Sequence, residues 1–342
     1  MISIFGFGCW NKLSCQGNPH LINVVESLSS RKDLDFGFIL GDSVYSNDDS
    51  KDSKQNMLTI NCGLDIINRI NLQKYGVLGN HDVYCNKQKS YLLNSQKIIL
   101  FEYNNSFYSF IRNTNGILIK VIVIDTNTYK DYNLKKEKCN ESDIDESVTF
   151  NFEEHMKNQK EFISKELEDI VNYDHIIIAG HEPLASSKTS NKLKKSKNMD
   201  EENKSLFIKN EHLEIDFLNF LCETMYKRFQ KYKTNFIYFC ADAHIFQHNI
   251  ITYKGEMIIN CIISGTGGAD PDVIPFEENI KFNIIEEISV KIIKSEPAFG
   301  YTVLKINKTK FEVEYCKVED FTSVKNKYKQ IKNIYIRIKN RW

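Results

Sequence analysis

Acidic, amide and imidazole side chains follow short apolar runs at several places in this chain. Asp42, Asn80 and His181 each come directly after a glycine that ends such a run. A glycine at that point permits a tight turn, which directs the next side chain away from the strand end. Carboxylate, amide and imidazole groups are ligands for metal ions. The spacing therefore predicts a metal site assembled from turns that are far apart in the sequence.

Buried strands are the elements that would position these side chains. Six short apolar runs end in polar or glycine-containing turns, as buried strands of α/β proteins do. They are Ile2–Phe7, Phe36–Leu40, Tyr75–Leu78, Ile117–Ile124, His175–Ala179 and Asn235–Cys240. The carboxyl ends of parallel strands meet at one edge of a sheet, where open α/β folds bind their ligands. We therefore expect the turns after these runs to converge.

Between the runs lie segments in which apolar residues return every three or four positions, which indicates helices. These segments are Leu21–Leu28, Ile60–Ile70, Gln159–Val171 and Ile215–Phe229. Towards the C-terminal end the pattern changes to strands only, at Met257–Ser264, Tyr301–Ile306, Phe311–Lys317 and Ile334–Ile338. We expect these later strands to complete a second sheet.

Four motifs, in a fixed order, carry a family resemblance. They are Gly41-Asp42-Ser43-Val44-Tyr45, Gly79-Asn80-His81-Asp82, Gly180-His181-Glu182-Pro183 and Asp242-Ala243-His244-Ile245-Phe246-Gln247. Together they resemble the calcineurin-like metallophosphoesterases, and Tyr45 narrows the resemblance to the purple acid phosphatases, especially the small tartrate-resistant type. The resemblance implies an α/β fold of the α+β sandwich kind, with two mixed β-sheets packed face to face and flanked by helices.

The resemblance also implies a binuclear metal centre. Asp42 would bridge the two metals, because each oxygen of a carboxylate can hold one cation. Tyr45 and His244 would hold the first metal, which is usually ferric iron in this family. Asn80 and His181 would hold the second metal, which is usually iron, zinc or manganese.

Cys9 is the first departure from the family pattern. The family has Gly-Asp-Trp-Gly after its first strand, whereas this chain has Gly8-Cys9-Trp10-Asn11. A nearby cation lowers the pKa of a thiol, so Cys9 could bind as a thiolate and would then favour zinc or ferrous iron over ferric iron. Alternatively, Cys9 is a small neutral residue and the first metal is weakened or lost. The sequence leaves both interpretations open.

Asp242 is the second departure. The family has Gly-His-x-His in its last motif, whereas this chain has Ala241-Asp242-Ala243-His244. A carboxylate is a competent ligand, so we expect Asp242 to bind the second metal. Its negative charge should weaken the binding of a phosphate or raise the pKa of the bridging water.

The reaction that the resemblance implies is hydrolysis of a small phosphomonoester by a metal-activated hydroxide. His81 would contact the substrate phosphate. The family often has a further histidine after its Gly-His-x-Pro motif, but Ala185–Leu193 contains none. His81 must then act alone, or the leaving group must be acidic enough to depart without a proton. One alternative is a non-catalytic scaffold or binding protein with the same fold, and another is a phosphodiesterase acting on nucleotides.

Composition limits the partners and the location. Lys plus Arg equals Asp plus Glu at 45 each, which does not favour nucleic acid. No apolar run approaches the roughly 18 residues of a membrane span. Met1 is followed at once by the first apolar run, so we expect an intracellular location. Nine cysteines without a Cys-x-x-Cys pair indicate reduced, mostly buried thiols.

One domain is expected over residues 1–318, followed by an extension over residues 319–342. Polar insertions near residues 46–56, 130–147 and 186–210 interrupt it and are predicted to be surface loops. The third insertion follows the His181 turn, so it is either solvated filler or a lid over the site.

Overall fold

The computed structural model describes most of the chain. The described residues are 1–12, 18–45, 53–84, 86–94, 98–102, 105–133, 150–168, 170–187, 213–234, 236–272, 279 and 281–318. Most of the three polar insertions, the predicted strand Ile334–Ile338 and the predicted C-terminal extension lie outside these residues. The domain boundary at residue 318 therefore stays a prediction.

The first sheet has five strands in the spatial order β13-β12-β1-β2-β3. Its parallel part is formed by β1 (Ile2–Phe7), β2 (Phe36–Ile39) and β3 (Gln73–Gly76). β12 (Gly300–Ile306) lies antiparallel to β1, and β13 (Phe311–Lys317) lies antiparallel to β12. The last two strands of the described chain thus join the sheet of the first strand.

The second sheet has eight strands in the order β10-β11-β8-β9-β7-β6-β5-β4. Its parallel part is formed by β5 (Ile117–Val123), β6 (His175–Ala179), β7 (Phe236–Cys240) and β9 (Met257–Ser264). The antiparallel strands are β4 (Tyr108–Thr114) on one side, and β8 (Phe246–Tyr253), β11 (Ile288–Glu296) and β10 (Lys281–Ile285) on the other. Both sheets are therefore mixed.

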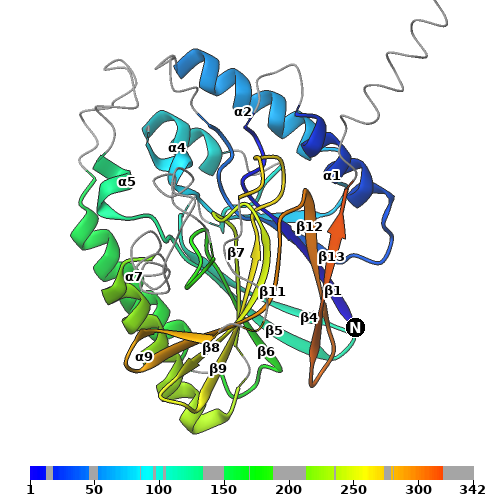
Figure 1. Cartoon of the computed structure of the whole chain (residues 1–342). Coiled ribbons are helices and arrows are strands. Elements are labelled where there is room, and N and C mark those ends of the chain that lie inside the picture. The colour runs from blue at the N-terminus through cyan, green and yellow to red at the C-terminus, as the bar shows by residue number, and fades with distance from the viewer. Residues whose placement is uncertain are drawn as a thin grey trace, which may run out of the picture.

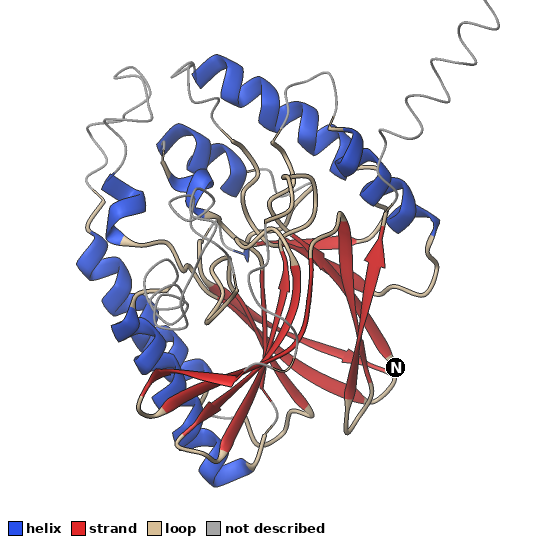
Figure 2. Cartoon of the chain, in the orientation of Figure 1, coloured by secondary structure: helices blue, strands red, loops and turns tan. Residues whose placement is uncertain are grey.

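The two sheets face each other in the middle of the molecule, and helices cover their outer sides (Figures 1 and 2). The long helices are α1 (Pro19–Ser30) and α2 (Ser53–Ile67) beside the first sheet, and α7 (Phe152–Glu166) and α9 (Ile215–Tyr232) beside the second. Three short helices are α3 (Asn80–Val83), α4 (Asn86–Leu93) and α5 (Tyr129–Asn133). The fold is the α/β sandwich that the sequence predicts.

β7 shows why a central strand is apolar throughout. Ile237 and Phe239 belong to the core between the two sheets, whereas Tyr238 and Cys240 belong to the core beneath α7 and α9. Successive side chains of a strand point to opposite faces, so a strand covered on both faces buries every residue. The rings of Phe239 and Phe38 lie 6.0 Å apart and join the two sheets.

The expectation that the later strands complete a second sheet is confirmed for β9 and wrong for β12 and β13. β12 and β13 belong to the first sheet, and β9 belongs to the sheet of β5, β6 and β7. The physical reason is that β1 is buried along its whole length, and pairing with β12 satisfies the backbone groups on its free side. Alternation along a strand indicates a half-covered strand but does not identify its partner.

Element boundaries differ from the predicted ones by a few residues. β3 begins at Gln73, two residues before the predicted Tyr75, and α7 begins at Phe152, seven residues before the predicted Gln159. α2 begins at Ser53, inside an insertion that the sequence predicts to be a loop. The sequence does not predict β4, β8, β10 and β11, because polar residues break the apolar pattern in each of them.

Cysteine chemistry departs from expectation at Cys62. Cys9, Cys222, Cys240, Cys261 and Cys316 carry reduced thiols, as the composition predicts. Cys62, by contrast, is disulfide-bonded.

Within the described ranges, no helix has both the length and the apolar character that a membrane crossing requires.

A buried carboxylate joins β5 to α5 and α7. Asp125 directly follows Ile124 at the end of the β5 run, and it accepts hydrogen bonds from Tyr132 Oη at 2.5 Å and from the Asn127 amide at 2.7 Å. His155 Nε2 lies 3.1 Å from Asp125 Oδ2. Burial alone would raise the pKa of Asp125, but the hydrogen bond and charge of His155 outweigh burial and lower this pKa to about 2.

We predict that this carboxylate stabilises the fold only when ionised. Its pKa is lower in the folded state than the ordinary value of 3.8, so its contribution is complete above about pH 4 and is lost as the pH falls towards 2. A difference of nearly two pKa units corresponds to about 2 kcal/mol. Asp125→Asn should lower the free energy of unfolding at both pH values, and the loss at pH 6 should exceed the loss at pH 2 by about 2 kcal/mol. Urea denaturation of the two proteins at each pH measures this difference. Parallel pH profiles for the two proteins would contradict this assignment.

Candidate metal centre

The turns that follow β1, β2, β6 and β7 meet at one edge of the two sheets. Backbone hydrogen bonds join them directly: Cys9 N donates to Gly41 O at 3.0 Å, and Ala241 N donates to His181 O at 2.9 Å. His181 Nδ1 lies 2.6 Å from Leu40 O, which connects the second sheet to the first. The convergence expected from the sequence is therefore present in the fold.

Three of the candidate ligands have left-handed backbone conformations. The φ angles of Cys9, Asp42 and Asp242 are 53°, 56° and 51°. This region is uncommon for residues other than glycine, and such residues gather at functional sites, where the surrounding structure holds them in place. Each of the three follows the end of a parallel strand, so the backbone turns sharply where a ligand is needed.

Gly41 and Gly79 make the close approach of two turns possible. A Cβ atom on Gly41 would lie 2.6 Å from Gly79 N and 2.6 Å from His181 Nδ1. A Cβ atom on Gly79 would lie 2.3 Å from Asp42 Oδ1. Both glycines are thus required by the space around Asp42 and His181.

Asp42 is buried at the centre of the cluster, and its two oxygens face different neighbours. Oδ2 accepts a hydrogen bond from Tyr45 Oη at 3.0 Å and lies 3.8 Å from Cys9 Sγ. Oδ1 lies 3.3 Å from His181 Nε2 and accepts a hydrogen bond from the backbone N–H of His81 at 3.2 Å. The Tyr45 side at Oδ2 and the His181 side at Oδ1 therefore differ, while Cys9 lies within reach of both, because its Sγ is also within 4.8 Å of a His181 ring nitrogen.

Cys9 and Asp242 both lie within this cluster. Cys9 Sγ is 3.7 Å from the backbone oxygen of Asp242, and Asp242 Oδ1 is 3.9 Å from His181 Nε2. One ligand atom from each of Cys9, Asp42 and His181 falls within 4.8 Å of the others, which is close enough to share a metal ion. Cys9 and Asp242 thus lie beside Asp42 and His181, and their role as metal ligands stays a prediction.

His244 completes the Tyr45 side. Its Nε2 lies 3.3 Å from Tyr45 Oη, and its Nδ1 lies 2.9 Å from the backbone oxygen of Asp270. The backbone N–H of His244 donates to Asp272 Oδ2 at 2.9 Å. Sequence reasoning missed Asp270 and Asp272, because no spacing rule connects them to the fourth motif.

Two buried ligand atoms test whether these residues fit a metal. Within the described part of the chain, Asn80 Oδ1 has no hydrogen-bond partner. His181 Nε2 makes no hydrogen bond of good geometry either, although Asp42 Oδ1 is 3.3 Å away. Buried polar atoms are rarely left unpaired unless an ion or water satisfies them. The donor set of carboxylate, amide, imidazole, phenol and thiol fits a transition metal.

The charges at the site depend on each other. Burial alone would raise the pKa of Asp42 and lower that of His181, but their mutual attraction outweighs burial and moves both pKa values the other way. Burial, followed by the negative charges of Asp42 and Cys9, holds the pKa of Tyr45 well above its ordinary value. A cation would compete with these protons, so metal binding should weaken as the pH falls.

Asp82 and Thr126 support the ligand turns from behind. Asp82 is fully buried and accepts hydrogen bonds from Ser43 N at 2.7 Å and from Gly79 N at 2.8 Å. Burial and the charge of Asp42 raise the pKa of Asp82 to about 7. Thr126 Oγ1 accepts a hydrogen bond from His181 N at 3.2 Å. These contacts hold the backbone of the turns that carry Asp42, Asn80 and His181.

The chain belongs to the calcineurin-like phosphoesterase family, which it matches over residues 4–221. This family generally consists of hydrolases and typically binds divalent metals. The expected family and fold are confirmed, and the purple acid phosphatase subfamily stays a prediction. No curated protein matches the chain in sequence.

Solved structures that resemble the fold include GAP50 and PhoD. GAP50, described as the anchor in the inner membrane complex of Plasmodium, is 14% identical with a TM-score of 0.53, and the alignment covers 93% of this chain and 89% of GAP50. PhoD is 12% identical with a TM-score of 0.53. The alignment covers 92% of this chain but only 65% of PhoD, so this chain spans less than two thirds of that protein. At such low identity the similarities show the shared fold alone.

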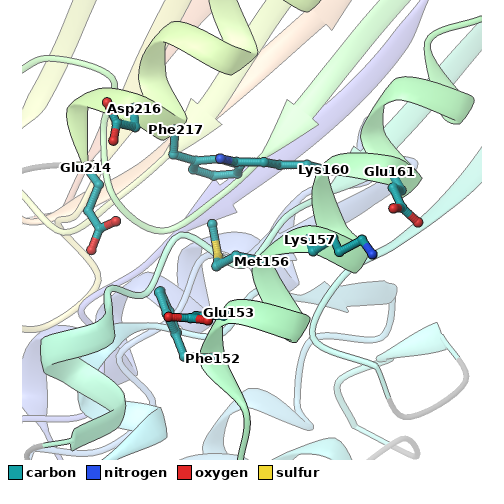
Figure 3. A pocket seen from close by; sticks show the side chains of 9 residues that line it. All are labelled: Phe152, Glu153, Met156, Lys157, Lys160, Glu161, Glu214, Asp216 and Phe217. Carbon is teal, nitrogen blue, oxygen red and sulfur yellow. The ribbon is translucent and has the colours of Figure 1, made fainter.

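A cavity of about 430 Å³ lies between α7 and α9, away from the candidate ligands. Its lining combines apolar and charged side chains, and Figure 3 shows Met156 and Phe217 between Glu153, Lys160 and other charged groups. None of the candidate metal ligands lines it. The cavity is therefore separate from the cluster around Asp42 that the four motifs form.

We predict that Cys9 binds metal as a thiolate. Cobalt(II) bound to the protein should then give a sulfur-to-metal charge-transfer band in the near-ultraviolet. Cys9→Asp, which restores the carboxylate of the family pattern, should still bind cobalt but lack the band, whereas Cys222→Ser should retain it. A wild-type cobalt complex without the band would instead support the interpretation of Cys9 as a small neutral residue.

Proposed function

We propose that this protein hydrolyses phosphomonoesters at a binuclear metal centre of the purple acid phosphatase type. The observation that carries the proposal is the two-sided contact of Asp42. Oδ2 faces Tyr45 and Cys9, and Oδ1 faces His181. These two sides match the ligand sets that the family resemblance implies for the first and second metals.

Each side of Asp42 has further ligands within reach. Tyr45 and His244 lie together beside Oδ2, and Cys9 would complete the first set. His181 and Asp242 lie together beside Oδ1, and Asn80 with its unpaired Oδ1 atom would complete the second set. When bound, two such cations would activate a water molecule and stabilise the phosphoryl oxygens. Iron, zinc and manganese fit these donors.

His81 is the group that we assign to the substrate phosphate. Its backbone N–H is bound to Asp42 Oδ1, and its ring lies 4.4 Å from the Tyr45 ring, measured between centroids. The imidazole is only partly buried, so a small phosphate ester can approach it. Because no histidine lies in Ala185–Leu193, we expect aryl phosphates, whose leaving groups are acidic, to be hydrolysed faster than alkyl phosphates.

A non-catalytic role is the second candidate, and two observations favour it. Cys9 and Asp242 replace the ligand types that the resemblance implies at their positions. The structure of GAP50, named as an anchor, shares this fold at a TM-score of 0.53. Fold does not fix function. Under this interpretation the chain would serve as a scaffold or binding protein and would need no turnover.

Turnover of an aryl phosphate distinguishes the two candidates. We expect the metal-loaded protein to hydrolyse a mono-aryl phosphate faster than a bis-aryl phosphate. Asp42→Ala should lower kcat/KM by more than about a hundredfold, because even partners behind the ligands are worth roughly 10- to 100-fold. Asp216→Asn, at an exposed position on α9, is the matched control and should retain activity. Fewer than one metal per chain together with no turnover would support the scaffold instead.

Asp242→His provides a test of the charge argument. Replacing the carboxylate by imidazole removes one negative charge from the site, and we expect a change of about 1 kcal/mol in the binding of an anion. Inhibition by inorganic phosphate should therefore become about fivefold stronger in Asp242→His. The inhibition constant, measured at fixed pH with both metals saturating, checks this. Equal inhibition of the two proteins would show that Asp242 does not act on the bound anion.

A further inference from the structure

Asn80 differs from the other candidate ligands because the two ends of its side chain are chemically unlike. Only Oδ1 has a lone pair for a cation, whereas the Nδ2 amide group is a donor. Either end of a carboxylate can bind a metal, but an amide binds only when it is turned the right way. A metal site that uses an asparagine therefore needs a group that fixes the amide orientation.

Tyr84 supplies such a group. Asn80 Nδ2 donates a hydrogen bond to Tyr84 Oη at 3.0 Å. Asn80 is the first residue of α3, and Tyr84, four positions later, is the C-cap residue that directly follows this helix and has a helical backbone conformation. Residues four apart on a helix lie on the same face, so the contact is a consequence of the helical turn. Tyr84 is 8% exposed, so its ring is held by packing.

The other end of the amide is left for a ligand. With Nδ2 bound to Tyr84, Oδ1 of Asn80 is buried and has no hydrogen-bond partner among the described residues. Turning the amide over would place the donor end where a cation ligand is needed. The hydrogen bond to Tyr84 is thus the contact that distinguishes the two orientations.

Tyr84 also contacts the residue proposed to meet the phosphate. Its ring lies 5.2 Å from the His81 ring at 61°, and the His81 ring lies 4.4 Å from that of Tyr45. Three rings therefore follow one another from the Asn80 side of the site to the Tyr45 side. This packing holds the Tyr84 hydroxyl at a fixed place relative to Asn80.

We propose that Tyr84 is a positioning residue for the second metal, whose hydroxyl holds the Asn80 amide with Oδ1 directed to the cation. The inference rests on the proposed binuclear centre. It assigns to Tyr84 a role that none of the four motifs contains. Groups that orient a ligand typically change metal affinity by roughly 10- to 100-fold.

A double-mutant cycle on Mn²⁺ binding tests the proposal, with affinities measured by calorimetry on the metal-free protein. Tyr84→Phe keeps the ring and removes the hydroxyl, and it should weaken the second Mn²⁺ site by at least about tenfold without changing the first. Asn80→Asp makes both ends of the side chain oxygen. In that background Tyr84→Phe should change the second site by less than about twofold, because a carboxylate needs no orientation.

Tyr108→Phe is the matched control. Tyr108 is buried and donates its hydroxyl hydrogen to Gly76 O at 2.8 Å, away from the candidate ligands, so its loss should leave both Mn²⁺ affinities unchanged. Tyr84→Leu is the second variant if Tyr84→Phe does not fold, and the same difference between the wild-type background and the Asn80→Asp background is expected. Melting curves of the metal-free proteins show whether each variant is folded.

The outcomes separate this proposal from the proposed function. A wild-type protein that binds no Mn²⁺, Zn²⁺ or iron would overturn the binuclear centre itself. If the wild type binds two ions and Asn80→Ala loses one, but Tyr84→Phe binds like the wild type, the positioning role alone is overturned. An equal loss from Tyr84→Phe in both backgrounds would also overturn it, because the hydroxyl would then act independently of the amide.

Discussion

The structure depends on a buried carboxylate that must be neutralised from both sheets. Asp42 is almost fully enclosed, and water cannot solvate its charge. The groups around it are Tyr45 from its own turn, the His81 backbone, and His181 from the other sheet. A buried charge without a partner costs several kcal/mol, so the two sheets must meet with these groups in place or leave Asp42 uncompensated. The same arrangement makes the site attractive to a cation.

The parallel strands and the turns that follow them could be predicted from the sequence, because both follow from local rules. Asp42, Asn80 and His181 follow a glycine at the end of an apolar run, and such a turn exposes the next side chain regardless of the rest of the fold. The resemblance then supplied an order for the motifs, and the family match over residues 4–221 covers the first three of them. The apolar runs are continuous because strands such as β7 place successive side chains in two different cores.

What sequence reasoning missed depends on contacts between distant segments. Strand β8 contains His248 and Asn249, so its apolar pattern is interrupted and the sequence does not predict it. The pairing of β12 with β1 joins residues about 300 positions apart, and no local pattern specifies it. Asp270 contacts the His244 ring through its backbone oxygen, and the Asp272 carboxylate accepts a hydrogen bond from the His244 backbone N–H, so neither contact follows from the spacing of the fourth motif. Tyr84 lies just beyond the second motif, and its proposed role can be inferred only from the orientation of the Asn80 amide in the structure.

The contact between His181 Nδ1 and Leu40 O links the packing of the two sheets to the binding of a cation. Because Asp42 raises the pKa of His181, a cation must displace a proton from this ring; the bond to Leu40 O then keeps the remaining hydrogen on Nδ1 and leaves the lone pair on Nε2. The backbone of the first sheet thereby sets the protonation form of a ligand from the second. Separation of the sheets would release the ring to the other tautomer, so the capacity to bind a cation is thermodynamically linked to the closure of the sandwich.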